Sequence, residues 1–488
     1  MFPIRPIFRV RQPPEIKYLF PSELKHYKIA VCLNKNHFQE RGMKETNPGL
    51  DQENSRRRFF KLLGGGFITA SSWPLVRQAY GQVATGQEKE QAPPIPKAAG
   101  AVDPADSKFW SFVREQFPIT KNKNIIYMNN GTMGPSPYYI QWMFFTKEQE
   151  VNFNGIYGGH DIARAKVAEF INCDEKEVVL THNVTEGINI IAQGLELKRG
   201  DEVIITNHEH AGNAIPWYTR AKRDRIVVKV APLGRDAAET LNNIERTITR
   251  KTRIIAVPHM TCTNGQILPA KEIVELAHRK RILVMLDGAH PPGMFKVDVR
   301  ELGCDFYATC GHKFLLGPKG TGFLYVKEQL FDRVEPIMTG GGSDSGWDYQ
   351  RGLHGWNSTA HRYDYGTQSL ALYYGLMSCF DFVNGIGIDN ITRRDRALAS
   401  KFLEGLKEIP QVEILTPLEE KSRCALTGFR LKNMPYDKFQ NWLMEKYKIR
   451  IRGVGEGGLN SLRVTTHIYN TFEEVDLLLE AIRQAARL

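Results

Sequence analysis

Three short apolar runs lie close together in this chain, between Ile282 and Val326. Residues 282–286, 305–309 and 321–326 have the length and composition of β-strands, and Gly or Pro residues separate them. Asp287 ends the first run, and the second leads into Lys313. Because ligands bind beyond the carboxyl ends of strands in an open α/β sheet, we expect Asp287 and Lys313 to face the same cleft.

This pair of side chains suits one kind of chemistry. A lysine can form a Schiff base with an aldehyde cofactor, and a buried carboxylate can keep a pyridine nitrogen protonated. Taken singly, an Asp at a turn and a solvated Lys would be the ordinary interpretation, since charged residues are mostly exposed. Here both Asp287 and Lys313 follow apolar strands among Gly, Ala and Cys residues, which favours a site. Lys319, in a Gly-Pro-Lys-Gly turn, is the competing lysine and is expected at the surface or beside a phosphate.

The segments DGAH (287–290) and DFYATCGHKFLLGPKGTGFLYV (305–326) resemble the class V aminotransferase family of fold-type I pyridoxal phosphate (PLP) enzymes. The resemblance extends from about Tyr127 to the C-terminus, and the family includes cysteine desulfurases, isopenicillin-N epimerase-like proteins and kynureninase. It implies PLP as cofactor and an α/β fold, with a mostly parallel seven-stranded sheet between helices and a smaller C-terminal α+β domain. We expect the large domain over residues 105–368 and the small domain over 369–488.

The phosphate of such a cofactor needs an anion site. Thr185 follows a strand at 178–180 and opens a helix at 186–194, and a helix N-terminus binds anions through free N–H groups and its dipole. A simple Thr N-cap is the alternative interpretation. The resemblance places the phosphate at Thr185 and adds further cofactor neighbours, namely Val184, His312, Cys310, His290 and Thr367. Cys310 and His290 depart from the desulfurase pattern, which has Ser and Gln there, so slightly weaker cofactor binding is expected.

A polar cluster follows the apolar run that begins at Val203, and it holds two histidines. The resemblance assigns His210 to stacking on the pyridine ring, because its spacing to Pro216 and Trp217 matches, and His208 fits less well. Asn213, three residues beyond His210, is expected near the substrate.

Arg463 lies among apolar residues in a candidate strand at 461–465. An unpaired buried guanidinium is unfavourable, whereas a substrate carboxylate would be a bidentate partner. The resemblance gives Arg463 that role, and a structural salt bridge is the alternative. Asn130, in a Gly/Asn/Pro turn, and Arg452 are further candidates for substrate binding.

The seven cysteines show no metal-ligand spacing, so no metal site is expected, and most should be buried thiols. Desulfurases carry a nucleophilic cysteine in a loop that matches residues 451–458, and this chain has none there. Cys262 stands where desulfurases carry a substrate-contacting Asn. We therefore rank an aminotransferase or epimerase of the isopenicillin-N epimerase-like type first. A β-lyase of the desulfurase or kynureninase type ranks second, and a non-catalytic scaffold third, since Lys313 and Asp287 are both retained.

The N-terminal residues carry most of the net positive charge of the chain. Residues 1–81 contain fourteen Lys or Arg against six Asp or Glu, so they carry +8 of the formal charge of +11, and a nucleic-acid partner is not expected. Residues 55–61 read SRRRFFK and precede an apolar run, which resembles a twin-arginine export signal. That run is too short and Gly-rich for a stable membrane span.

These features predict how the first hundred residues are organised. We expect a signal peptide over 43–81, a translation start at Met43 with residues 1–42 as a gene-model extension, and a disordered linker over 82–104. The export machinery would then be a partner and the periplasm, or another extracytoplasmic compartment, the location. The resemblance also implies a homodimer that shares its active sites.

Overall fold

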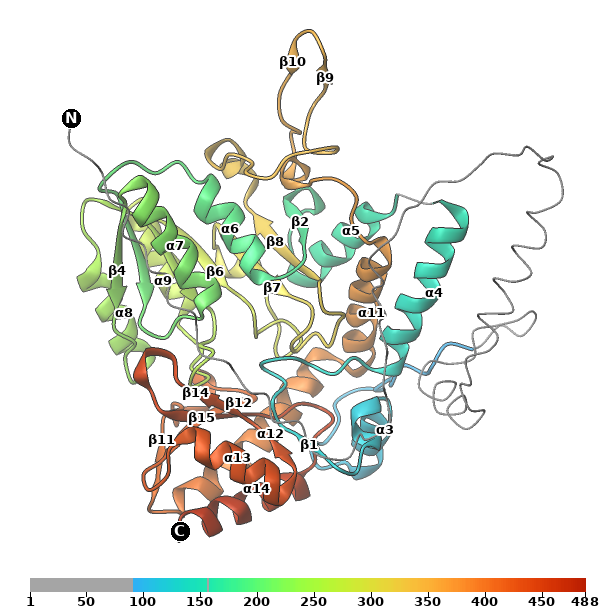
Figure 1. The fold of residues 1–488 in the computed structure, drawn as a ribbon, viewed down its shortest axis with the longest axis vertical. Coiled ribbons are helices and arrows are strands. Elements are labelled where there is room, and N and C mark those ends of the chain that lie inside the picture. Colours follow the sequence, from blue (N-terminus) through green and yellow to red (C-terminus); the bar gives the residue numbers. More distant parts are fainter. Residues whose placement is uncertain (1–90, 156–157) are drawn as a thin grey trace, which may run out of the picture. The chain divides into compact units, whose positions relative to one another are not determined.

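The computed structural model describes residues 91–155 and 158–488. The predicted export signal, the proposed start at Met43 and the first part of the predicted linker lie outside the described residues. The centre of the fold is a seven-stranded sheet with the order β2-β8-β7-β6-β5-β3-β4 (Figure 1). All its strands are parallel to one another except β8, which runs antiparallel to both neighbours. The strands are β2 (Val178–Thr181), β3 (Glu202–Thr206), β4 (Val227–Ala231), β5 (Thr252–Pro258), β6 (Leu283–Asp287), β7 (Phe306–Cys310) and β8 (Gly322–Val326).

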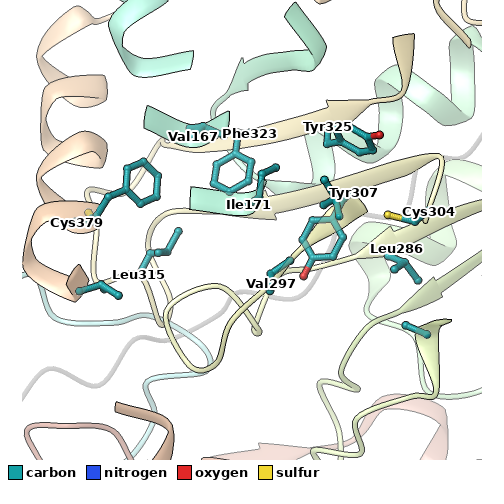
Figure 2. Packing of buried hydrophobic residues seen from close by; sticks show 14 of the residues in the cluster. Val167, Ile171, Leu286, Val297, Cys304, Tyr307, Leu315, Phe323, Tyr325 and Cys379 are labelled. Atoms are coloured by element: carbon teal, nitrogen blue, oxygen red, sulfur yellow. The ribbon is translucent and has the colours of Figure 1, made fainter. Parts of the chain in front are cut away.

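Helices cover both faces of this sheet, as the continuous apolar runs predict for buried parallel strands. Successive side chains point to opposite faces, so Val284 and Leu286 pack in one hydrophobic cluster and Met285 in the other. Figure 2 shows part of the first cluster, in which Ile171 lies next to Phe323 of a strand. The first cluster includes residues of α5 (His160–Ile171), α9 (Ala270–Arg279) and α11 (Leu370–Ile386), and the second includes residues of α6 (Val184–Gly194) and α7 (Ala211–Asp224).

A second sheet forms the core of the C-terminal domain. It is antiparallel with the order β11-β12-β15-β14, and residues of its strands and three helices share a separate hydrophobic cluster. Its elements are β11 (Val412–Ile414), β12 (Leu426–Leu431), β14 (Arg452–Val454), β15 (Ser461–Thr465), α12 (Ile388–Lys407), α13 (Tyr436–Tyr447) and α14 (Phe472–Ala485). In addition, β1 (Ile126–Tyr127) pairs in parallel with β13 (Ile449–Arg450), which ties the start of the folded body to this domain. The predicted fold class is confirmed.

The remaining elements connect these layers. Two short strands, β9 (Trp347–Asp348) and β10 (Gly352–Leu353), form a hairpin that stands away from the main sheet (Figure 1). Within residues 91–155 and 158–488, no helix has both the length and the hydropathy needed to cross a membrane. The other helices are α3 (Ser107–Glu115), α4 (Tyr138–Asn154), α8 (Ala237–Thr247) and α10 (Val299–Leu302), with short 3₁₀ turns η1 (Pro118–Lys121), η2 (Glu175–Glu177), η3 (Glu328–Arg333), η4 (Ala360–Tyr363), η5 (Glu420–Ser422) and η6 (Glu456–Gly458).

Two stretches differ from the sequence-based expectation. Residues 91–104 belong to the predicted disordered linker, yet they form an extended arm bound to the folded body. The Ala98 amide donates to Gly385 O (2.9 Å), and the Asn390 side chain bonds both Val102 N (2.8 Å) and Gly100 O (2.9 Å). Helix α11, which was expected in the small domain, packs instead in the hydrophobic cluster of the large sheet.

Candidate active site

Asp287 and Lys313 follow neighbouring strands of the large sheet. Because β6 and β7 are adjacent and parallel, their carboxyl ends lie at the same edge. The Asp287 side chain is only 5% exposed, and its Oδ1 accepts a hydrogen bond from Ala289 N (2.9 Å). Burial raises the pKa of Asp287, and the nearby charge of Lys313 acts in the opposite direction. The structure therefore brings the predicted acid and lysine to one site, while Lys319 is exposed.

The start of α7 forms a second wall of this site. His210 is the N-cap of α7, and its Nδ1 accepts a hydrogen bond from Gly212 N (3.0 Å). Burial and the charge of Lys313 lower the pKa of His210, so its ring is neutral at pH 7 and carries its proton on Nε2. Gly212 permits a close approach of α6, because a Cβ there would lie 2.5 Å from Thr185 Oγ1. The predicted ring-stacking residue and the predicted phosphate residue are thus neighbours.

The N-terminus of α6 lies where the sequence predicts an anion site. Val184 and Thr185 lie in its first turn, and Asn183 caps the helix by accepting a hydrogen bond from Glu186 N (3.0 Å). Amides in a first helical turn have no partner within the helix, so they can bind a phosphate.

His312 also suits a phosphate. Burial, with the charges of Lys313 and Lys319, lowers the pKa of His312 to about 4. Its Nδ1 is buried and has no hydrogen-bond partner among the described residues, and a phosphate oxygen would provide one. Together with the buried acid beside Lys313, these groups fit PLP.

The other predicted cofactor neighbours differ in their burial. Cys310 Sγ lies 3.6 Å from Ala289 O, and burial raises its pKa to about 11, so the thiol is neutral. His290 Nε2 lies 3.1 Å from Gly131 O and 3.4 Å from Lys313 Nζ. Both residues therefore adjoin the Asp287–Lys313 pair. Thr367 is exposed.

Arg463 enters the site from the small domain. Its side chain is completely buried in β15, where Nη1 donates to Cys262 O (2.7 Å) and Nη2 to Thr132 Oγ1 (2.7 Å). Its Nε is buried without a partner, and no carboxylate of residues 91–155 or 158–488 forms an ion pair with it. Burial lowers the pKa of Arg463 to about 10. The structure thus lacks the salt bridge that was the alternative interpretation.

The remaining predicted substrate residues differ in their placement. Asn130 is buried, with Oδ1 accepting from the Tyr469 hydroxyl (3.2 Å) and Nδ2 left without a partner in the described part of the chain. Arg452 lies opposite Arg463 in the β14–β15 ladder and forms an ion pair with Glu456.

Asn213 does not offer its side chain to the site. Its Nδ2 donates to Glu209 Oε2 (2.8 Å) and Ala256 O (3.0 Å), and its Oδ1 accepts from Trp217 Nε1 (3.2 Å). These bonds use the amide internally, so the structure differs here from the expected substrate contact.

Two residues near the site were not predicted. Thr132 holds the Arg463 guanidinium, although 331 residues of sequence separate them, and no local pattern could reveal that contact. Burial raises the pKa of Glu209 to about 8, and the nearby charge of Asp287 acts in the same direction. Glu209 lies four residues before Asn213, and this spacing could have indicated the hydrogen bond between the two side chains.

Most of the chain matches a known protein family. A profile of the Aminotransferase class-V family matches residues 138–478. A probable cysteine desulfurase from Halalkalibacterium halodurans is 32% identical over 342 residues, which cover 67% of this chain and 82% of that protein. A second, from Methanothermobacter thermautotrophicus, is 30% identical over 77% of this chain and 97% of that protein.

Solved structures agree with this similarity. The cysteine desulfurase CsdA from Escherichia coli superimposes with a TM-score of 0.70 at 25% identity, covering 80% of this chain and 99% of that one. The cystine C-S lyase C-DES, in complex with its reaction product cysteine persulfide, gives 0.68 at 26% identity, covering 75% and 99%.

These relatives correct the order of the predicted functions. The aminotransferase or epimerase ranked first is wrong, because the similar proteins are cysteine desulfurases and a C-S lyase, which belong with the alternative ranked second. The expected cofactor is supported, since a related structure holds PLP. Both the sequence match over residues 138–478 and the geometry around Lys313 lead to one conclusion: this chain is a member of the class V aminotransferase family of PLP-dependent enzymes.

Proposed function

We propose that this protein is a PLP-dependent β-lyase that cleaves the carbon–sulfur bond of a sulfur-containing amino acid. In this proposal the sulfur departs on the leaving group and is not transferred to a cysteine of the enzyme. The observation that carries the proposal is a site built around Lys313, Asp287 and Arg463, with no cysteine in the segment at residues 451–458. The similarity to a cystine C-S lyase, whose reaction product is cysteine persulfide, supports it.

In the proposed reaction each residue of the site would have a separate role. When bound, PLP would supply an electron sink for the negative charge that develops at the substrate α-carbon. Arg463 would bind the substrate carboxylate, and His210 would cover the face of the cofactor ring. Asp287 would keep a proton on the ring nitrogen. Lys313 Nζ would take the α-proton, after which the Cβ–S bond breaks and the sulfur leaves with both electrons.

The overall reaction balances with water as the only other reactant. An amino acid of the form R–S–CH₂–CH(NH₃⁺)–COO⁻ and one water give R–SH, pyruvate and ammonium. No oxidant or reductant is needed. With cystine as the substrate, R–SH is cysteine persulfide.

The cysteines of the described chain are poorly suited to accept sulfur. Cys262 is nearest to Arg463, but burial raises the pKa of its thiol, although the charges of Arg463 and Lys313 act in the opposite direction. Burial also raises the thiol pKa of Cys424 and Cys310. Because the thiolate is the nucleophile, a persulfide on these residues is disfavoured.

Product analysis tests the proposal. The PLP-loaded protein is incubated with L-cystine and, separately, with L-cysteine, and pyruvate, alanine and protein-bound sulfur are measured. We expect pyruvate and ammonium in equal amounts, no alanine, and no reaction with Lys313→Ala. Alanine together with sulfur bound to the protein would instead identify a cysteine desulfurase and reject the proposal.

A further inference from the structure

His467 lies just beyond β15 and is completely buried. Both of its ring nitrogens have partners in distant parts of the chain. Nδ1 lies 2.9 and 3.2 Å from the two carboxylate oxygens of Asp395, which is in α12 and equally buried. Nε2 lies 3.2 Å from Phe314 O. The imidazole therefore connects a helix of the small domain to the backbone of the residue after Lys313.

Other parts of the chain contact three consecutive backbone carbonyls, those of His312, Lys313 and Phe314. Gly134 N donates to His312 O (2.7 Å), and a Cβ at Gly134 would lie only 2.1 Å from Lys313 O. Phe314 O faces His467, and on another side it meets Gly293, where a Cβ would lie 2.3 Å away. Of these contacts, the bond from His467 is the one made by an ionisable side chain.

The proton positions on His467 follow from its partners. A carbonyl oxygen only accepts, so Nε2 must carry a proton to bond Phe314 O. Both carboxylate oxygens of Asp395 face Nδ1. This arrangement holds the tautomer and the orientation of the ring, as a carboxylate does for a histidine whose other nitrogen has a task. The ring of Phe314 also packs edge-on against His467, with centroids 5.0 Å apart.

We propose that His467, oriented by Asp395, is a positioning residue that sets the direction in which Lys313 presents its amine to PLP. The proposal rests on Lys313 as the cofactor lysine and not on the identity of the substrate. It consequently survives if the lyase proposal fails. The competing explanation is that His467 only fastens the small domain to the large one.

Two isosteric variants separate these explanations. The amide nitrogen of a glutamine lies near the place of Nε2, so His467→Gln retains a donor for Phe314 O. The amide nitrogen of an asparagine lies near the place of Nδ1, so His467→Asn loses that donor. Both remove the imidazole. His278→Gln serves as a matched control. His278 lies on α9, a helix that carries none of the site residues, and its Nε2 is 2.9 Å from Oδ2 of Asp305.

Three measurements need no substrate. They are the dissociation constant of PLP, the pH midpoint of the visible absorption band of the PLP-loaded protein, and the thermal midpoint of the cofactor-free protein. We expect His467→Asn to weaken PLP binding roughly 2- to 10-fold, the effect of one hydrogen bond, and to shift the pH midpoint of the band. His467→Gln should restore most of both, and His278→Gln should change neither.

The opposite pattern would overturn the proposal. Equal values for the two His467 variants, or lower thermal midpoints with unchanged PLP affinity and an unchanged pH midpoint, would leave only a fastening role. If neither variant folds, Asp395→Asn decides. A shifted band midpoint with weaker PLP binding supports positioning, and unchanged values reject it.

Discussion

Replacing Arg463 by methionine should separate its role in substrate binding from its role in stability. Burial lowers the pKa of Arg463 to about 10 from an ordinary 12.5, so at neutral pH the folded chain holds this charge at a cost of roughly 3 kcal/mol. Methionine removes the charge and gives up the hydrogen bonds to Cys262 O and Thr132 Oγ1, which contribute at least about 1.5 kcal/mol each because the donor is charged. The gain and the loss offset each other, so the free energy of unfolding of the substrate-free protein should stay about the same.

Activity should respond in the opposite direction. A carboxylate held by a guanidinium through charge-assisted bonds gains about 3 kcal/mol, so Arg463→Met should lower kcat/KM for an S-substituted cysteine about 100-fold. The assay compares this amino acid with the amine that lacks its carboxylate. The wild type should prefer the amino acid, and Arg463→Met should lose that preference.

A second arginine on the same sheet provides the control. Arg430 lies on β12 and pairs with Glu413 at the surface (2.7 Å), so Arg430→Met should preserve both activity and substrate preference. The reasoning is refuted if Arg463→Met lowers activity on both substrates by the same factor. A marked fall in its unfolding midpoint would also refute it, because Arg463 would then be a structural residue.

Three further perturbations follow from the geometry. Asn213→Ala should lower the free energy of unfolding by about 1–3 kcal/mol, by leaving buried partners unpaired, with an unchanged KM in steady-state kinetics. Gly134→Ala should displace the Lys313 carbonyl and lower kcat roughly 100-fold, whereas Gly100→Ala, with no atom within 4 Å, should match the wild type. Burial lowers the pKa of His259 to about 4, so the unfolded chain binds more protons between about pH 6.5 and pH 4. Denaturant titrations should show the free energy of unfolding falling by up to about 3 kcal/mol as pH drops through this range, and His259→Asn should flatten that dependence.

The main sheet could be predicted because each of its strands is buried on both faces. Such strands appear as continuous apolar runs bounded by Gly or Pro, and the runs predicted at 282–286 and 305–309 lie within one residue of β6 and β7. Asp287 and Lys313 could be located in the same way, because strand ends are visible in a sequence.

Features that depend on distant contacts could not be predicted. Helix α11 is apolar on nearly all sides, so its sequence does not reveal which domain it joins. Residues 91–104 have the composition of a linker, yet a short arm needs no core of its own when it docks on a surface already formed by Gly385 and Asn390. Asn213 lies in the first turn of a helix, and only the position of β5 decides which way its amide points.

The order of the candidate reactions was the other failure. PLP enzymes of one family share the lysine and the acid, and the reaction depends on loop residues whose chemistry the sequence does not encode locally. The twin-arginine signal, the extracytoplasmic location and the shared-site homodimer stay predictions.

Arg463 and His467 lie only four residues apart on one continuous stretch of backbone. In the proposed reaction Arg463 binds the substrate carboxylate, and His467 bonds the carbonyl of Phe314, the residue after Lys313. One short segment of the small domain thus fixes the spacing between Arg463 and the side chain that contacts the backbone beside Lys313. A tilt of the C-terminal sheet would move both side chains together relative to Lys313.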